Sequence, residues 1–277
     1  MACAWHRQVR LAALAAAKHT PRKRQQEQHG KPNRKRSGAA IVQFHGGGHT
    51  QGMNDMYRSV AARLAKMTDC AVYSIDYAAA EGLVFPSVHD ECFAAYCALS
   101  QGALKGNRII TIGDSFGANL MLSACLRLRD GGMSLPTAVI CISPYVDMAA
   151  SGASYENNCR ADPLYGLPKS QSYAQYASAV RRISPYCGNT PKIQPLLSPA
   201  YGNFRGFPDM FVSCGGLETS ASDSHMLVSR VRQSGVRVQF HEYGGMWHDF
   251  AYMFPRLKES KAAWRHMHLF VDDILSR

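Results

Sequence analysis

The sequence predicts an α/β protein in which a mostly parallel central sheet is flanked by helices. From Gly38 onward, short β-branched runs alternate with longer stretches of helical period. The 277 residues are 46% hydrophobic and 18% charged, a composition that can bury one large core and is not typical of a disordered chain. No apolar run reaches the roughly 18 residues that a membrane-spanning helix requires.

Six short apolar runs, bounded by turn-forming residues, are predicted to be strands. In chain order they are residues 39–44, 71–76, 108–113, 137–143, 210–214 and 236–243. Because stretches of helical period separate most of these runs, successive strands are expected to lie parallel in one sheet.

Between the strands, apolar residues recur at steps of three and four, which is the period of an amphipathic helix. After Pro86, for example, Val88, Cys92, Ala95 and Leu99 fall near one face. The predicted helices are residues 56–67, the segment after Pro86, and residues 118–129, 171–183, 220–234 and 255–275.

The chain divides into a basic leader, residues 1–37, and a body, residues 38–277. Within the body, periodicity fades over residues 144–208 into Tyr, Pro and Gly. We interpret this stretch as a cap-like insertion between two strands, because such excursions usually cover a site.

The net charge of +11 belongs mainly to the leader. The first 36 residues hold ten basic residues and one acid, whereas the rest of the chain holds 21 basic and 19 acidic residues. The nearly neutral body disfavours nucleic acid as a partner. The leader shows no convincing strand and is expected to be flexible; a targeting segment and a nucleic-acid-binding arm are the alternatives.

Nine cysteines, an odd number without any Cys-x-x-Cys pair, favour buried free thiols over a disulfide framework. Free thiols are typical of a reducing compartment, so we expect a cytoplasmic location. No zinc-like spacing occurs, and neither a metal nor an organic cofactor is predicted.

Ser115 lies between Gly113 and Gly117, at the junction of a predicted strand and a predicted helix. A nucleophile at such a junction projects from a tight turn in which only small neighbours fit. Upstream, three successive glycines follow His45 directly after the strand 39–44. Their backbone N–H groups can approach a substrate oxygen and stabilise an oxyanion.

A base and an acid are expected after the serine, near the ends of later strands. His248 fits the base, because it lies in a Gly-rich loop just after the strand 236–243. Glu218 follows the strand 210–214 and is preferred as the acid over Asp223, which falls in a predicted helix. Asp249 is expected to point elsewhere. Four other histidines fall inside predicted helices or strands and fit less well: His225, His241, His266 and His268.

These motifs resemble the hormone-sensitive-lipase-like branch of the α/β-hydrolases, over residues 39–275. Residues 45–48 match its His-Gly-Gly-Gly motif, and residues 113–120 resemble its Gly-Asp-Ser-Ala-Gly-Gly-Asn-Leu elbow. Further matches, in the order of the family, are residues 76–77, 85–86, 143–144, 162–163, 198–199 and 206–208. The resemblance implies Ser115 as nucleophile, His248 as base and Glu218 at the position of the acid, which is more commonly Asp in the family.

The resemblance also implies that the backbone N–H groups of Gly47, Gly48 and Phe116 form the oxyanion hole. Phe116 replaces the usual Ala and is expected to narrow the acyl site. Family members usually carry cap helices and two strands before the glycine motif. We therefore expect a reduced cap and missing N-terminal strands.

The sequence thus predicts a serine carboxylesterase that hydrolyses short-chain acyl esters, with a small-molecule ester as its partner. An amidase or deacetylase with the same three residues is one alternative, and a non-catalytic ligand-binding protein on this fold is another. A homodimer through an edge strand or the final helix is a further possibility.

Overall fold

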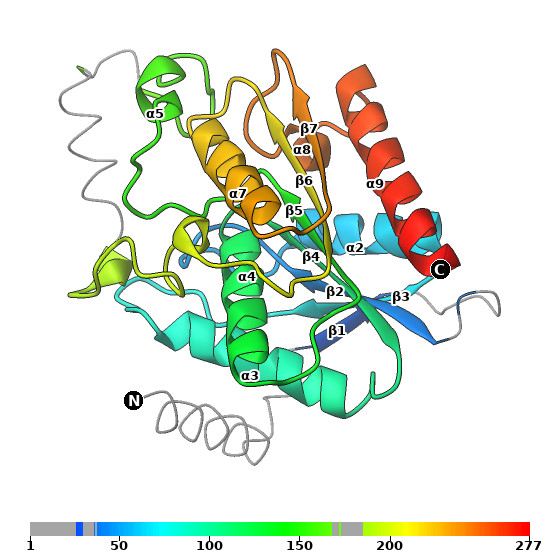
Figure 1. Cartoon of the computed structure of the whole chain (residues 1–277). Helices are drawn as coiled ribbons and strands as arrows, with labels where there is room; N and C mark the ends of the chain where they lie inside the picture. Colours follow the sequence, from blue (N-terminus) through cyan, green and yellow to red (C-terminus); the bar gives the residue numbers. More distant parts are fainter. Residues whose placement is uncertain (1–25, 30–35, 37, 168–171, 173–184) are drawn as a thin grey trace.

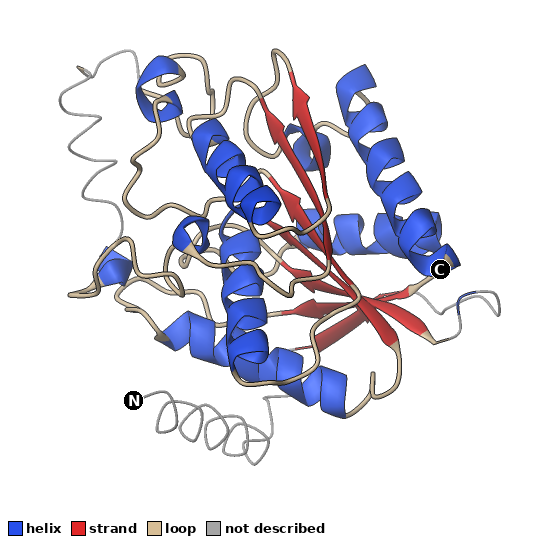
Figure 2. Ribbon diagram, viewed as in Figure 1, coloured by secondary structure: helices blue, strands red, loops and turns tan. Residues whose placement is uncertain are grey.

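The computed structural model describes residues 26–29, 36, 38–167, 172 and 185–277. Over these residues the chain forms one twisted sheet with helices packed on both faces (Figures 1 and 2). In the described ranges, no helix is both long and apolar enough to cross a membrane.

Seven strands form the sheet in the order β1-β3-β2-β4-β5-β6-β7. Their bounds are β1 Gln26–His29, β2 Ala39–Phe44, β3 Ala71–Ile75, β4 Arg108–Asp114, β5 Ala138–Ile142, β6 Asp209–Gly215 and β7 Val238–Tyr243. Only β1 runs antiparallel to its neighbour, β3, and the other five neighbouring pairs are parallel.

Among the described residues, one set of helices covers one face of the sheet and a second set covers the other (Figure 1). The first set is α3 Ser87–Gln101, α4 Ser115–Asp130 and α7 Ala221–Gln233, and the second is α2 Asp55–Thr68, α8 Phe250–Met253 and α9 Lys258–Ser276. Between β5 and β6 lie the short helices α5 Ser154–Asn157, η2 Pro185–Cys187 and η3 Pro199–Tyr201.

Side-chain alternation along the strands builds two hydrophobic cores. Val42 and Phe44 of β2 belong to the core that also holds residues of α3 and α4, whereas Ile41 belongs to the core of α2 and α9. A strand covered on both faces must be apolar at nearly every position, because successive side chains point to opposite faces. This requirement explains the continuous apolar runs in the sequence.

The six predicted strands of the body are confirmed, with ends that shift by at most two residues. The helix predicted at residues 118–129 begins earlier, at Ser115, since the chain turns directly from β4 into α4. The helix predicted at residues 171–183 falls almost wholly outside the described residues.

The expectation that the leader contains no strand is wrong. Residues Gln26–His29 pair antiparallel with β3, from Gln26 opposite Ile75 to His29 opposite Val72. The segment Gln-Glu-Gln-His has no hydrophobic alternation, so no sequence pattern indicates it. Backbone pairing along the edge of β3 forms this strand, and the sheet therefore has one of the N-terminal strands that were expected to be missing.

The parallel arrangement places the carboxyl ends of β2, β4, β5, β6 and β7 at one edge of the sheet. The loops that follow these strands contain the glycine motif, the Ser115 turn, Ser143, Glu218 and His248. In open α/β sheets, ligands bind at this edge.

Substitution of Leu64 tests how much the core beneath α2 contributes to stability. This side chain is fully buried, so Leu64→Ala should lower the free energy of unfolding by about 2–5 kcal/mol through lost burial and a residual cavity. Leu269→Ala, on the exposed side of α9, should change it by less than about 0.5 kcal/mol. Urea denaturation followed by circular dichroism measures both, and equal losses would contradict this assignment of the core.

Candidate active site

Ser115 occupies a strained turn between β4 and α4. Its φ of 50° lies in the left-handed region, which costs a non-glycine residue about 1–3 kcal/mol and is found mainly where the surrounding structure enforces it. A side chain at Gly117 would overlap the carbonyl oxygens of Phe44 and His45, and one at Gly113 would overlap the backbone of Gly117 and Ala118. Gly117 therefore lets the turn pack directly against the end of β2, and Gly113 lets the end of β4 pack against the start of α4.

The glycine loop that follows β2 is held by two side chains. The Gly46 N–H donates to Asp114 Oδ1 at 3.1 Å, which ties the loop to the residue before Ser115. The Tyr77 hydroxyl lies 3.0 Å from each of the carbonyl oxygens of His45, Gly46 and Gly48. Gly47 and Gly48 have φ values of 92° and 65°, so both need the conformational freedom of glycine.

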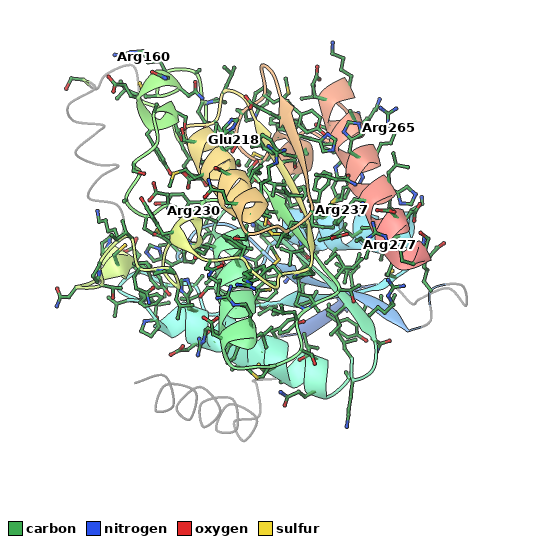
Figure 3. All side chains as sticks on the ribbon, in the orientation of Figure 1. Arg160, Glu218, Arg230, Arg237, Arg265 and Arg277 are labelled. Atoms are coloured by element: carbon green, nitrogen blue, oxygen red, sulfur yellow. The ribbon has the colours of Figure 1, made fainter. Side chains whose placement is uncertain are left out.

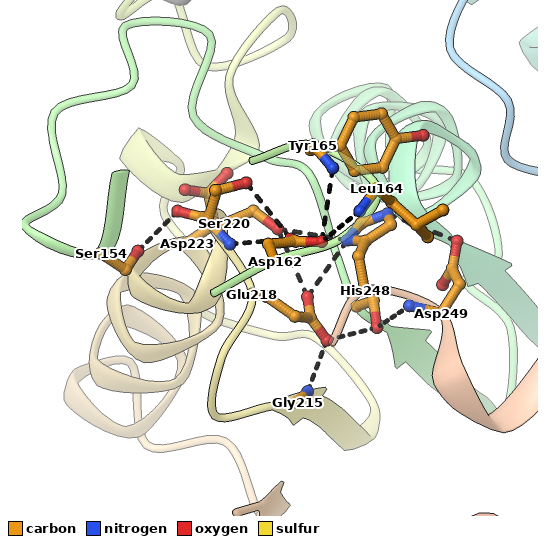
Figure 4. A network of polar contacts seen from close by, with 12 residues as sticks. Ser154, Asp162, Leu164, Tyr165, Gly215, Glu218, Ser220, Asp223, His248 and Asp249 are labelled. Atoms are coloured by element: carbon orange, nitrogen blue, oxygen red, sulfur yellow. Dashed lines mark hydrogen bonds and ion pairs between the residues drawn. The ribbon is translucent and has the colours of Figure 1, made fainter. Parts of the chain in front are cut away.

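His248 and Glu218 form a buried pair at the same edge of the sheet (Figure 4). His248 Nδ1 lies 3.2 Å from Glu218 Oε2. The other carboxylate oxygen, Oε1, accepts a hydrogen bond from Ser143 Oγ at 2.7 Å and another from the Gly215 N–H. Ser220 Oγ lies 3.3 Å from both His248 Nδ1 and Glu218 Oε2. These contacts fix the carboxylate and orient the imidazole ring.

Carboxylates dominate the electrostatics of His248. Burial by itself lowers its pKa, but the nearby Asp249 and Glu218 carboxylates outweigh burial and raise the pKa to about 10. Glu218 lies in the interior near the end of β6, whereas the five arginines labelled in Figure 3 are all exposed. The charge that favours ionisation of Asp114 and Asp249 is that of His248 itself.

The structure gives different positions to Asp223 and Asp249, the two other acids that were considered. Asp223 lies in α7, where its Oδ2 accepts the N–H groups of Val146 and Asp147, each at 2.9 Å. It thereby anchors the start of the insertion. The expectation that Asp249 points elsewhere is wrong, because its Oδ2 lies 3.4 Å from His248 Nε2. Asp249 also adopts a left-handed φ of 52°, a conformation that is uncommon for a non-glycine residue.

Several polar residues at this site had no predicted role. Ser143 bridges the loops of β5, β6 and β7, since it also accepts the Asp249 N–H at 3.1 Å. Asp162, within the insertion, accepts the N–H groups of Thr219 and Leu164, each at 3.0 Å. Asp162 thus joins the insertion to the loop that carries Glu218. Their only sequence signal is that each precedes a proline at a position matching the family pattern.

Aromatic rings surround the serine and the histidine. Phe116 is buried and packs edge-on against Tyr186, with ring centroids 5.6 Å apart, and His49 lies 6.2 Å from Phe116. On the other side, the half-exposed Tyr165 packs edge-on against His248 at 4.8 Å. The site therefore has apolar walls beside its reactive groups.

The four histidines that fitted the role of base less well lie on α7, β7 and α9. His225 pairs with Glu242 at 2.9 Å, and His241 stacks on His266 with ring centroids 4.3 Å apart. Within the described part of the chain, no group of three or more His, Cys, Asp or Glu side chains is arranged to hold a metal ion.

Comparison with known proteins agrees with this geometry. A profile described as the α/β hydrolase fold matches residues 41–252. An acetyl-hydrolase of Streptomyces hygroscopicus is 29% identical over 229 residues, which cover 83% of this chain and 74% of that protein. An esterase of Acinetobacter venetianus is 32% identical over 228 residues, covering 80% of this chain and 72% of that protein.

The chain therefore belongs to the α/β-hydrolase fold family. The crystal structure of an esterase from the bacterial hormone-sensitive lipase family matches it with a TM-score of 0.75 and 28% identity, covering 95% of this chain and 89% of that one. Within the α/β-hydrolases, the chain is a member of the hormone-sensitive-lipase-like branch, as the motifs predicted.

The contact between Gly117 and the end of β2 can be tested by adding one methyl group. Gly117→Ala should lower the free energy of unfolding by about 3 kcal/mol, at the upper end of overpacking costs, because both opposing atoms are backbone oxygens. Gly52→Ala is the matched control, since a side chain there meets open space. Chemical denaturation of both variants measures the difference. A Gly117→Ala variant as stable as Gly52→Ala would show that the turn does not pack as described.

Proposed function

We propose that the protein is a serine carboxylesterase that hydrolyses short-chain acyl esters through an acyl-enzyme intermediate. The observation that carries the proposal is the buried contact of 3.2 Å between His248 Nδ1 and Glu218 Oε2, at the sheet edge where Ser115 occupies its strained turn. Relatives and structural neighbours named as esterases support the ester-hydrolase class.

In the proposed mechanism, Ser115 Oγ attacks the ester carbonyl while His248 Nε2 takes its proton. Glu218 holds Nδ1–H and stabilises the imidazolium that forms. The imidazolium then protonates the leaving alcohol, and the acyl group stays on Ser115. Water, activated by the same histidine, attacks the acyl-enzyme and releases the acid.

The negative charge that develops on the carbonyl oxygen needs fixed donors. We assign this role to the backbone N–H groups of Gly47, Gly48 and Phe116. Phe116 lies in the first turn of α4, where the free N–H groups of a helix and its dipole favour an anion. Tyr77 supports the arrangement, because it binds the carbonyl oxygens of the glycine loop on one side.

We infer the preference for a small acyl group from the side chains beside the serine. Phe116 is bulkier than the alanine usual at this position, and its ring packs edge-on against Tyr186 and His49. The relative from Streptomyces hygroscopicus is named an acetyl-hydrolase, which supports the preference for a short acyl chain. We therefore propose acetyl and other short-chain esters as substrates.

The thiols support the proposed cytoplasmic location. Eight cysteines lie in the described residues, and all eight are buried and free. Buried free thiols are typical of a reducing compartment.

Hydrolysis of p-nitrophenyl esters of increasing chain length tests the proposal. The protein should cleave the acetyl and butyryl esters faster than long-chain ones, and Ser115→Ala should lower kcat by at least ~10³-fold because the nucleophile is lost. Ser123→Ala is the matched control, since Ser123 is a buried serine two turns later in the same helix, and it should retain activity.

Two other outcomes would redirect the assignment. Turnover of p-nitroanilide amides in preference to esters, still dependent on Ser115, would favour the amidase alternative. Folded protein that binds esters without cleaving them would favour a ligand-binding role.

A second prediction concerns the acid. Glu218→Gln keeps the shape of the side chain but removes its charge, so kcat should fall by about 10²–10⁴-fold because the imidazolium loses its partner. Glu242→Gln, on the exposed part of β7, is the control and should leave kcat unchanged. A Glu218→Gln enzyme with unaltered kcat would overturn the role of this acid.

A further inference from the structure

His248 lies between two carboxylates, although the proposed mechanism uses only one of them. Glu218 Oε2 lies 3.2 Å from Nδ1, and Asp249 Oδ2 lies 3.4 Å from Nε2. Nε2 is the atom that must accept the proton of Ser115. In the structure this nitrogen is buried and makes no hydrogen bond to the described residues, so Asp249 is an acidic neighbour at the reactive side of the ring.

The position of Asp249 is fixed by the backbone. Its φ of 52° lies in the left-handed region, which a non-glycine residue adopts mainly where the surroundings enforce it, and its N–H donates to Ser143 Oγ at 3.1 Å. Ser143 in turn donates to Glu218. The two carboxylates on either side of the imidazole are thus joined through one hydroxyl, and the arrangement is set by the loops rather than by a mobile surface side chain.

The carboxylate of Asp249 is only partly satisfied by hydrogen bonds. Its Oδ1 is buried and has no hydrogen-bond partner among the described residues, and the same is true of Asp114 Oδ2, one residue before the nucleophile. Buried carboxylate oxygens are normally paired, because leaving one unsatisfied costs free energy. An acid kept in such a position calls for an explanation beyond packing.

The other groups near Asp249 are acids or neutral hydroxyls. Glu218 and Asp162 are acidic neighbours of Asp249, and burial raises the pKa of Asp114 well above its usual value. Tyr57, Tyr165 and Tyr252 contribute phenol groups whose pKa is raised by burial. Burial raises the pKa of Asp249, whereas the charge of His248 lowers it. His248 is therefore the basic group whose positive charge stabilises the ionised forms of Asp114 and Asp249.

We propose that Asp249 is a positioning residue that stabilises the protonated imidazole of His248 from the Nε2 side and so sets the pH above which Ser115 can be activated. The proposal rests on the proposed function, in which His248 is the general base. When Asp249 is ionised, it favours the imidazolium, whose Nε2 carries a proton and cannot accept another. Activation of Ser115 then requires that this proton leave.

The direction of the pH effect follows from this arrangement. A carboxylate near an imidazole favours its charged form and raises its pKa, so removing the carboxylate lowers that pKa. The neutral, active histidine of an Asp249→Asn enzyme then appears at a lower pH. The acidic limb of the kcat/KM profile should move down by about one pH unit or more, which gives about tenfold higher activity, or more, at pH values well below both midpoints.

Asp249→Asn in the full chain tests the proposal, with p-nitrophenyl acetate hydrolysis measured from about pH 6 to about pH 11.5 and the uncatalysed rate subtracted, because the range must extend beyond the wild-type His248 pKa of about 10. The matched control is Asp69→Asn. Asp69 also has a left-handed φ, 55°. It is exposed, lies at the end of α2 and is not part of the site around His248. This control should leave the profile unchanged. Asp249→Gly, which suits the same backbone conformation, serves as a second neutral variant if Asp249→Asn folds poorly.

An NMR titration of the His248 imidazole in the Ser115→Ala background separates this proposal from the proposed function. The Asp249→Asn change should lower the titration midpoint by about one unit or more even in this inactive protein. If the midpoint is lowered but the wild-type protein, with Ser115 intact, does not hydrolyse esters, the effect of Asp249 on His248 is retained and the esterase is rejected. An unchanged midpoint and an unchanged acidic limb in folded Asn and Gly variants would overturn the role of Asp249.

Discussion

The packing of the Ser115 turn against the end of β2 is the contact on which the site depends. Gly117 has no side chain, so the backbone of α4 can approach the carbonyl oxygens of Phe44 and His45. Because β2 and β4 are neighbouring parallel strands, with Phe44 opposite Gly113, the glycine loop and the serine turn leave the sheet side by side. Asp114 then fastens one to the other through the Gly46 N–H. The close contact is thus a consequence of strand order.

Buried charge is the second constraint. Glu218 and Asp249 contact His248 (Figure 4), and Asp114 lies near enough to feel its charge. The labelled arginines are exposed elsewhere (Figure 3). Charges removed from water are tolerated when hydrogen bonds and opposite charges compensate them. Glu218 is compensated by Ser143, Gly215 and His248. Asp114 and Asp249 each retain a buried oxygen without such compensation, so the cluster favours proton uptake.

The sequence predicted the features that depend on local pattern and strand order. Apolar runs and helical periods located the six parallel strands, and the rule that sites form at the carboxyl ends of strands singled out Ser115, Glu218 and His248 for the site. What it could not predict depends on individual backbone angles and long-range contacts. The contact between Asp249 and His248 involves a residue with a left-handed φ, which the sequence does not signal, and the bridge through Ser143 joins loops more than 70 residues apart. The strand β1 was missed because it is polar and pairs only through its backbone.

The antiparallel strand β1 has a consequence for the solution behaviour of the protein. Val72 and Ile75 of β3 are fully buried on the faces of the sheet, and β1 occupies the hydrogen-bonding edge beside them. A bare edge of this kind presents unpaired N–H and C=O groups to any passing strand and promotes aggregation. Because β1 is short and polar, it makes a less aggregation-prone outer edge than β3 would. We expect a protein that lacks Gln26–His29 to expose the edge of β3 and to self-associate more readily, while it keeps every residue of the site.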